Sequence, residues 1–274
     1  MVVDLARPLA VAAAALALFA AAGAGHAGTS TMPDADDVVG PLDIKSVSQG
    51  HAGTKVVHTI RTFATWRVGV LAPSTPNYFL LELSTDADAA PERSVLVFSR
   101  AGHMVGAIFG ANGRFVAQAG VFHANGRTVR VTIPRRRLGN PVAYRWQAFA
   151  FFRGATVCRT GCLDRAPNGS VRILHDLRKP TIAFPQPGAP AGPEYDVGFS
   201  LSDTGGSGIA GWRLEHRLLG ETVWTIVATG TTAGAQTYHE VSAPGDQDQF
   251  RVVAVDGHGN TATSPVRTVA VPVR

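Results

Sequence analysis

Short runs in which apolar and polar residues alternate dominate the chain from about residue 38 onward. In residues 129–133, valine or isoleucine alternates with arginine or threonine. At 79–83, Phe79, Leu81 and Leu83 alternate with Leu80 and Glu82, and residues 95–97 belong to another short run. A repeat of two residues is typical of a β-strand with one buried and one exposed face. No segment keeps the repeat of an amphipathic helix over a helix-length window. The pattern therefore predicts an all-β fold.

Turn signals separate these runs. Asn-Gly at 112–113 and at 125–126 lies between apolar segments, and both residue types tolerate the positive φ angles of tight hairpins. Residues 144–152 are apolar on both faces, which is typical of a central strand. The expected architecture is a sandwich of short antiparallel strands.

A proline-rich stretch divides the pattern in two. Residues 180–193 contain five prolines, and proline cannot donate to a β-ladder, so this density excludes a central strand. We expect a semi-rigid linker or an edge strand at 179–193. On either side we expect one β-sandwich domain, the first at 38–178 and the second at 194–274. The second has the size of one immunoglobulin-like sandwich.

Three stretches of the second domain resemble known families. They are the Gly/Asp-rich connection at 202–209, the strand at 212–217 followed by Trp224, and the segment at 250–260, which ends in Asp-Gly-His-Gly-Asn. Together they resemble the fibronectin type III and bacterial immunoglobulin-like families, which mostly serve as spacers or as adhesion and binding modules. The resemblance implies a sandwich but no particular ligand.

The first domain is similar to the carbohydrate-binding-like sandwiches of secreted proteins. Its opening at 42–44 and its acidic turn at 85–88 carry that similarity. In those relatives acidic turns hold calcium, which makes Asp86 and Asp88 the candidate metal ligands here. The turn lacks the dense carboxylates and the glycine of a strong calcium loop, and the alternative is a polar hairpin end. No other cofactor is predicted.

The N-terminus has the pattern of a secretory signal peptide. Arg7 supplies a positive charge, residues 9–22 are apolar, and small residues follow at 23–28. Cleavage after Ala24 or after Ala27 satisfies the requirement for small side chains. We expect a signal peptide at 1–27, too short in its apolar run for a bilayer span. A flexible lead-in at 28–37 follows, and the mature protein is secreted without a membrane anchor.

The two cysteines agree with export. Cys158 and Cys162 lie four positions apart with Gly161 between them, and an oxidising compartment would keep a disulfide formed. Half of a zinc site is the alternative, but a zinc site needs three or four ligands and His175 is alone nearby. A structural disulfide is the prediction.

The charge of the chain favours a polyanion ligand only superficially. The net charge is +5, and only three of the 25 basic residues are lysines. Apart from the run 135–137, the arginines are scattered, whereas a nucleic-acid binder concentrates them on one face. We therefore predict no nucleic-acid partner.

Sequence signatures of enzymes are missing. Residues 206–208 lack the full Gly-x-Ser-x-Gly elbow, and His239-Glu240 lacks a second histidine one helical turn away. No phosphate-binding loop or dinucleotide fingerprint occurs. The prediction is a non-enzymatic protein, with a hydrolase that assembles its site from distant residues as an alternative.

Four aromatic residues carry the remaining functional signal. Trp66, Tyr78, Tyr144 and Trp146 would stack on sugar rings if they faced outward, or anchor the core if they faced inward. The leading hypothesis is a secreted binding or interaction protein that recognises extracellular glycan or cell-surface protein. A structural or adhesive surface component without a small ligand is the other non-enzymatic alternative.

Overall fold

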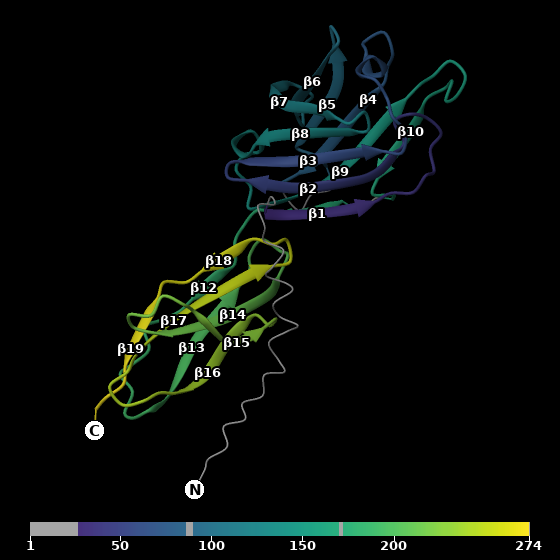
Figure 1. Cartoon of the computed structure of the whole chain (residues 1–274). Coiled ribbons are helices and arrows are strands. Elements are labelled where there is room, and N and C mark those ends of the chain that lie inside the picture. The colour runs from purple at the N-terminus through teal and green to yellow at the C-terminus, as the bar shows by residue number, and fades with distance from the viewer. Residues whose placement is uncertain (1–26, 86–89, 170–171, 274) are drawn as a thin grey trace. The chain divides into compact units, whose positions relative to one another are not determined.

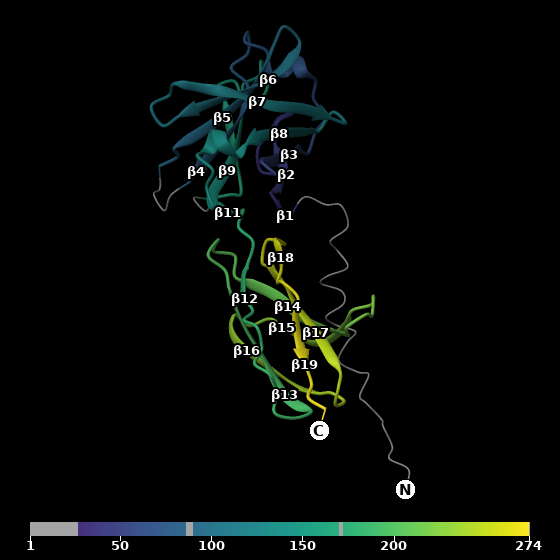
Figure 2. The ribbon, with the colours of Figure 1, turned by 90° about the vertical axis from the view of Figure 1, so that its left-hand side faces the viewer.

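Antiparallel strands make up almost all of the regular structure (Figures 1 and 2). The computed structural model describes residues 27–85, 90–169 and 172–273. Within them the only helices are two short 3₁₀ segments, η1 (Val68–Leu71) and η2 (Arg135–Leu138). The chain divides into two units between Arg178 and Lys179, each with its own buried core. The predicted all-β fold is confirmed.

The first domain has two layers of strands. Its strands are β1 (Ala27–Pro33), β2 (Ile44–Ala52), β3 (Lys55–Thr62), β4 (Tyr78–Ser84), β5 (Arg93–Arg100), β6 (His103–Gly110), β7 (Phe115–Ala124), β8 (Thr128–Pro134), β9 (Ala143–Phe152), β10 (Cys162–Ala166) and β11 (Ile173–Asp176). One layer has the order β1-β2-β3-β8 and the other the order β6-β5-β4-β9-β10, with β11 also paired to β9. Every pairing is antiparallel, as hairpin connections require.

Strand β7 belongs to both layers. Its first half, up to Ala119, pairs with β6, and its second half, from Gly120, pairs with β8. The layers are therefore continuous through main-chain hydrogen bonds on this side. On the other side β2 approaches β10, and the backbone N–H of Ile44 donates to Asp164 Oδ2 at 2.5 Å. We call this place, where β2 meets β10, the seam.

The core of the first domain lies between these layers. Tyr144 and Trp146 from β9 are buried there with Phe79, Leu81 and other inward-facing residues. Strand β9 is central, because β4 lies on one side of it and β10 and β11 lie on the other. The apolar run at 144–152 therefore predicts its place correctly.

The second domain is a seven-stranded sandwich whose last strand is interrupted. Its strands are β12 (Thr181–Ala183), β13 (Glu194–Ser202), β14 (Ile209–Leu218), β15 (Thr225–Gly230), β16 (Gly234–Val241), β17 (Gln247–Asp256), β18 (Thr261–Thr263) and β19 (Arg267–Ala270). The first, second and fifth strands form one sheet, and the third, fourth, sixth and last form the other. Trp212 and Phe250 are buried between the sheets. This strand order is that of a fibronectin III or immunoglobulin-like fold, as predicted.

The structure adds detail to the two segments that the sequence describes as a lead-in, 28–37, and as a linker or edge strand, 179–193. Strand β1 occupies much of the expected flexible lead-in at 28–37 and pairs with β2. Backbone hydrogen bonds to β2 hold this edge strand, so it needs no alternating apolar residues. Its sequence therefore gave no strand signal. At 179–193, β12 pairs with β13 as an edge strand and Phe184 is buried in the core, so the edge-strand alternative describes the start of this stretch.

Most of the expected signal peptide at 1–27 lies outside the described residues, which begin with the strand residue Ala27. In the part of the chain that the structure describes, no helix is long and apolar enough to cross a membrane.

Candidate functional site

In the first domain, the layer β6-β5-β4-β9-β10 carries apolar residues on the surface that faces away from the core. Cross-strand register places Leu96 beside Leu80, and Leu80 beside Phe149. In the next row Tyr78 lies beside Phe151, which lies beside Leu163. We call this surface the outer face, and its members are Tyr78, Leu80, Leu96, Phe98, Phe149, Phe151 and Leu163.

The outer face is partly open to solvent and has aromatic rings in defined positions. Leu163 is 53% exposed, and Tyr78 and Phe151 are half-buried. The rings of Tyr78 and Phe151 are stacked, with centroids 5.4 Å apart and planes inclined by 15°. The guanidinium of Arg165 lies 5.2 Å from the centre of the Phe149 ring. Apolar side chains that gather on a partly exposed sheet surface are candidates for contact with a ligand or partner.

The disulfide loop lies against one end of the outer face. The predicted Cys158–Cys162 disulfide is present. Between the cysteines, Gly161 has a φ of +101°, and a Cβ atom there would lie 2.5 Å from Cζ of Phe151. Only glycine therefore allows the loop to approach the ring this closely. The loop helps to fix the position of Phe151.

Polar groups border the outer face along the next row of the sheet. Glu82 lies between Ser94 and Gln147 in the strand register. Arg172 forms an ion pair with Glu82 at 3.4 Å, and Gln147 donates to the carbonyl oxygens of Pro167 and Gly169. Hydrogen-bonding groups thus stand beside the aromatic rings.

The four aromatic residues singled out from the sequence separate into two groups. Trp66, Tyr144 and Trp146 are at most 5% exposed and belong to the core, which confirms the core interpretation for them. Tyr78 alone of the four lies on the outer face. Phe151 was missed as a half-buried residue of the outer face, although a run that is apolar on both faces carries that signal in its outward-facing half. Phe149 on the same face is only 7% exposed.

A chain of polar rings is buried inside the first domain. The hydroxyl of Tyr144 lies 2.8 Å from Nε2 of His58 and 2.6 Å from Nδ1 of His175. Nε2 of His175 lies 3.3 Å from Nδ1 of His51. Burial lowers the pKa of His58 to about 3, so this ring is neutral at physiological pH. His58 and His175 have no exposed surface, and His51 at the end of this chain of rings is half-buried.

Aspartates from three parts of the first domain gather at the seam. Asp34, Asp36 and Asp37 lie in the loop after β1, Asp43 immediately precedes β2, and Asp164 lies on β10. Carboxylate oxygens of Asp37, Asp43 and Asp164 lie within 4.8 Å of one another.

Burial and mutual repulsion disfavour the charged forms of these carboxyl groups. Burial raises the pKa of Asp43 to about 7, with further contributions from a hydrogen bond to Asp36 and the charge of Asp164. Burial and the charge of Asp164 raise the pKa of Asp34 to about 6. The pKa of Asp164 is also raised, chiefly by burial. Asp86 and Asp88, the ligands expected from the sequence, lie outside the described residues, and a metal there stays a prediction.

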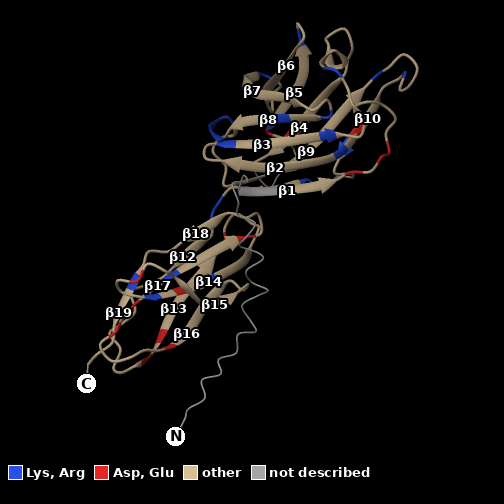
Figure 3. Ribbon diagram, in the orientation of Figure 1, with Lys and Arg blue, Asp and Glu red and all other residues tan. Residues whose placement is uncertain are grey.

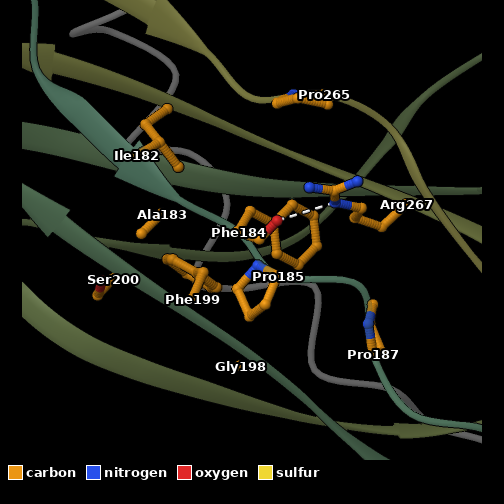
Figure 4. Close-up of a pocket in the computed structure, with 10 residues that line it drawn as sticks. All are labelled: Ile182, Ala183, Phe184, Pro185, Pro187, Gly198, Phe199, Ser200, Pro265 and Arg267. Atoms are coloured by element: carbon orange, nitrogen blue, oxygen red, sulfur yellow. Dashed lines mark hydrogen bonds between the residues drawn. The ribbon is translucent and has the colours of Figure 1, made fainter.

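A shallow groove in the second domain is mostly apolar (Figure 4). Its lining residues are Ile182, Ala183, Phe184, Pro185, Pro187, Gly198, Phe199, Ser200, Pro265 and Arg267. The single charged residue among them is Arg267, whose Nε donates to the carbonyl oxygen of Phe184 at 2.8 Å. The groove therefore has no pair of groups for acid–base chemistry.

The sequence motifs of the second domain stabilise turns. Asp203 accepts hydrogen bonds from the N–H groups of Gly205 and Gly208. Asp256 accepts from the N–H groups of His258 and Asn260 and from Nδ2 of Asn260. These carboxylates act as Asx-type caps of loop backbone. These contacts explain why aspartate occurs at these two positions of the loops.

The basic and histidine-containing motifs also have local contacts. In η2, the guanidinium of Arg135 donates to the carbonyl of Pro141, and the carbonyl of Arg137 accepts from Nε of Arg93. His239 lies 3.0 Å from Asp196, and both side chains are exposed. Figure 3 shows lysine and arginine spread over many strands and loops of each domain.

Of the comparisons with known proteins, only the one with solved structures finds matches. No protein-family model matches the chain, and no curated protein matches it. The fibronectin(III)-like modules of Clostridium thermocellum CbhA are 14% identical over 89% of this chain and 94% of theirs, with a TM-score of 0.36. The FN1–FN3 domains of chicken CNTN1 are 15% identical over 85% and 68%, with a TM-score of 0.30. Titin A168–A170 is 9% identical over 91% and 100%, with a TM-score of 0.34.

All three TM-scores are low, so the assignment of the second domain rests on its own strand order. That order defines the class of protein: an all-β chain with a fibronectin III or immunoglobulin-like domain at its C-terminal end.

Proposed function

We propose that this chain is an extracellular, non-enzymatic binding protein and that the outer face of its first domain binds polysaccharide. The observation that carries the proposal is the stack of half-buried Tyr78 on half-buried Phe151 within the apolar outer face. The second domain serves as a spacer or docking module.

The chemistry of the outer face suits sugar rings. Pyranose rings present C–H groups on their flat faces, and these pack on aromatic rings, while their hydroxyl groups need hydrogen-bond partners at the edge. Here Tyr78 and Phe151 supply half-buried rings, and Glu82 and Arg172 supply polar groups alongside. Because the rings sit on strands, the surface is rigid and loses little entropy on binding.

Export supports the same proposal. The disulfide between Cys158 and Cys162 is the kind of bond that persists in oxidising compartments, and the N-terminal pattern predicts secretion. Extracellular polysaccharide is the macromolecule that a secreted chain of this kind meets in quantity.

Binding of the purified full chain to insoluble polysaccharides, including cellulose, chitin and cell-wall glycan, tests the proposal. We expect Tyr78→Ala and Phe151→Ala each to weaken binding roughly tenfold, the loss of one stacking contact of about 1.4 kcal/mol. Phe122→Ala is the matched control, because Phe122 is 62% exposed on β7 and lies outside the outer face. Absence of binding to every polysaccharide, or equal losses in all three variants, would refute the proposal.

An adhesive contact with a protein surface is the second candidate. Leu80, Leu96 and Leu163 give the outer face an aliphatic component that sugar stacking does not require. Obligate protein interfaces bury such residues. Leu80→Ser would then abolish capture of a surface protein in a cross-linking experiment, while binding to polysaccharide would be absent in the unaltered chain.

A further inference from the structure

We propose that the aspartates at the seam form a Ca²⁺ site in which Asp37, Asp43 and Asp164 supply ligand oxygens. This inference is independent of the proposed function and concerns residues on the other side of β9 from the outer-face strands β4 and β5.

Buried carboxylate oxygens without partners are the first evidence. Asp43 is 3% exposed and Asp164 is 2% exposed, and Oδ1 of each accepts no hydrogen bond. Oδ2 of Asp34 is also buried without a partner. Among the described residues, no lysine or arginine forms an ion pair with any of these aspartates. A buried carboxylate without a counter-charge is costly, and a bound cation removes that cost.

The spacing of the oxygens is the second line of evidence. Calcium binds oxygen ligands at 2.3–2.6 Å, so two ligands on one ion lie at most about 5 Å apart. The three carboxylate oxygens meet this limit, since all lie within 4.8 Å of one another. The protein anchors two of these carboxylates: Ile44 N–H donates to Asp164 Oδ2, and Asn168 Nδ2 donates to Asp37 Oδ2 at 3.0 Å. These contacts orient the carboxylates.

Solvent reaches the cluster through an open hollow. Asp36, Asp37 and Asp43 line it with Gly40 and Phe63. An ion entering from this side keeps part of its water shell, and calcium usually fills six to eight positions from carboxylates, carbonyls and water. The partly exposed and partly buried arrangement therefore allows both access and direct ligation.

The chemical type of the donor atoms indicates which metal ion the cluster would bind. The cluster contains carboxylates and neither histidine nor cysteine, whereas zinc and copper sites in proteins use nitrogen or sulfur ligands. Carboxylates and water suit hard cations, and the irregular set of loop and strand residues suits the flexible geometry of calcium better than the strict octahedron of magnesium. The raised pKa of Asp43 agrees, because an acidic cluster without a cation retains protons.

Isothermal titration calorimetry of the chelator-treated full chain with CaCl₂ tests the site. We expect one saturable site with a Kd between about 10⁻⁵ and 10⁻³ M, in the range of extracellular calcium modules. Asp43→Asn should weaken binding at least tenfold. Asp37→Asn should do the same without threatening the fold, because Asp37 is exposed.

Asp196→Asn provides the matched control, since it removes an exposed carboxylate of the second domain. It should leave calcium binding unchanged. A thermal melt should show that CaCl₂ raises the first transition of the unaltered chain and not that of Asp37→Asn. No heat and no thermal shift at 10 mM CaCl₂, about tenfold above the weakest affinity expected here, would overturn the proposal. So would unchanged affinity in Asp37→Asn.

Discussion

The hydroxyl group of Tyr144 lies between the imidazole rings of two histidines in the core. It has one proton, so when it donates to one ring nitrogen it accepts from an N–H group of the other. Its partner His58 also packs edge-on against Trp146, with ring centres 4.2 Å apart. This ring has no exposed surface, so protonation would place an uncompensated charge in the core.

The pH dependence of stability should reveal this residue. An unfolded histidine has a pKa of 6.5, and the native pKa of His58 is about 3. Between these values the unfolded state binds more protons. The free energy of unfolding of the first domain therefore falls as pH drops below 6.5, by up to about 1.4 kcal/mol per pH unit. Urea denaturation followed by circular dichroism at pH 7, 5 and 4 measures this loss.

The variant His58→Gln isolates the contribution of this histidine to the pH dependence of stability. The variant should be less stable than the unaltered chain at pH 7 but should lose less on acidification, because glutamine does not titrate. The raised pKa values of Asp34 and Asp43 act in the opposite sense, and they cancel in this comparison. The exposed His103→Gln is the control. An unchanged pH slope in His58→Gln would contradict the argument.

Single residues were the least predictable part of the molecule. The usual role of tryptophan and tyrosine as core anchors in sandwiches is confirmed for Trp66, Tyr144 and Trp146. The cluster around Asp43 and Asp164 was not predictable, because Ile44, the neighbour of Asp43, lies 120 positions from Asp164 and only the contact at the seam brings these residues together. The spacing of residues within a short stretch of sequence cannot predict such a long-range contact.

At the scale of elements, the disulfide loop is expected to act through the outer face. Replacing Cys158 and Cys162 together with serine should cost at most about 2 kcal/mol, since the closed loop is short. Binding of polysaccharide should weaken even where the variant is still folded. Without the disulfide, the loop is no longer held with Gly161 against the ring of Phe151. Pull-down at a temperature where the variant is folded measures this. Full binding by the folded variant would show that the loop does not position Phe151.

Strands with a buried face were predictable, and strands held only by backbone pairing were not. The segments at 79–83 and 129–133 alternate clearly and form β4 and β8. Strand β1 gave no such signal, because its pairing with β2 uses N–H and C=O groups that every residue carries.

For the whole molecule, the separate cores predict separate unfolding. Phe250 is fully buried in the second core, and Phe250→Ala should destabilise that domain by about 3–5 kcal/mol. Differential scanning calorimetry should show one transition lowered and the other, which calcium raises, unchanged. Equal movement of both transitions would indicate that the domains unfold together.

Because β7 passes from one layer to the other, the two sides of the first domain should differ in how easily the layers separate. Separating the layers at β7 requires rupture of a hydrogen-bonded ladder, whereas the side chain of Asp164 bridges them at the seam. Transient opening, and with it the first attack by a protease, should therefore begin beside β10 and leave the β7 side closed.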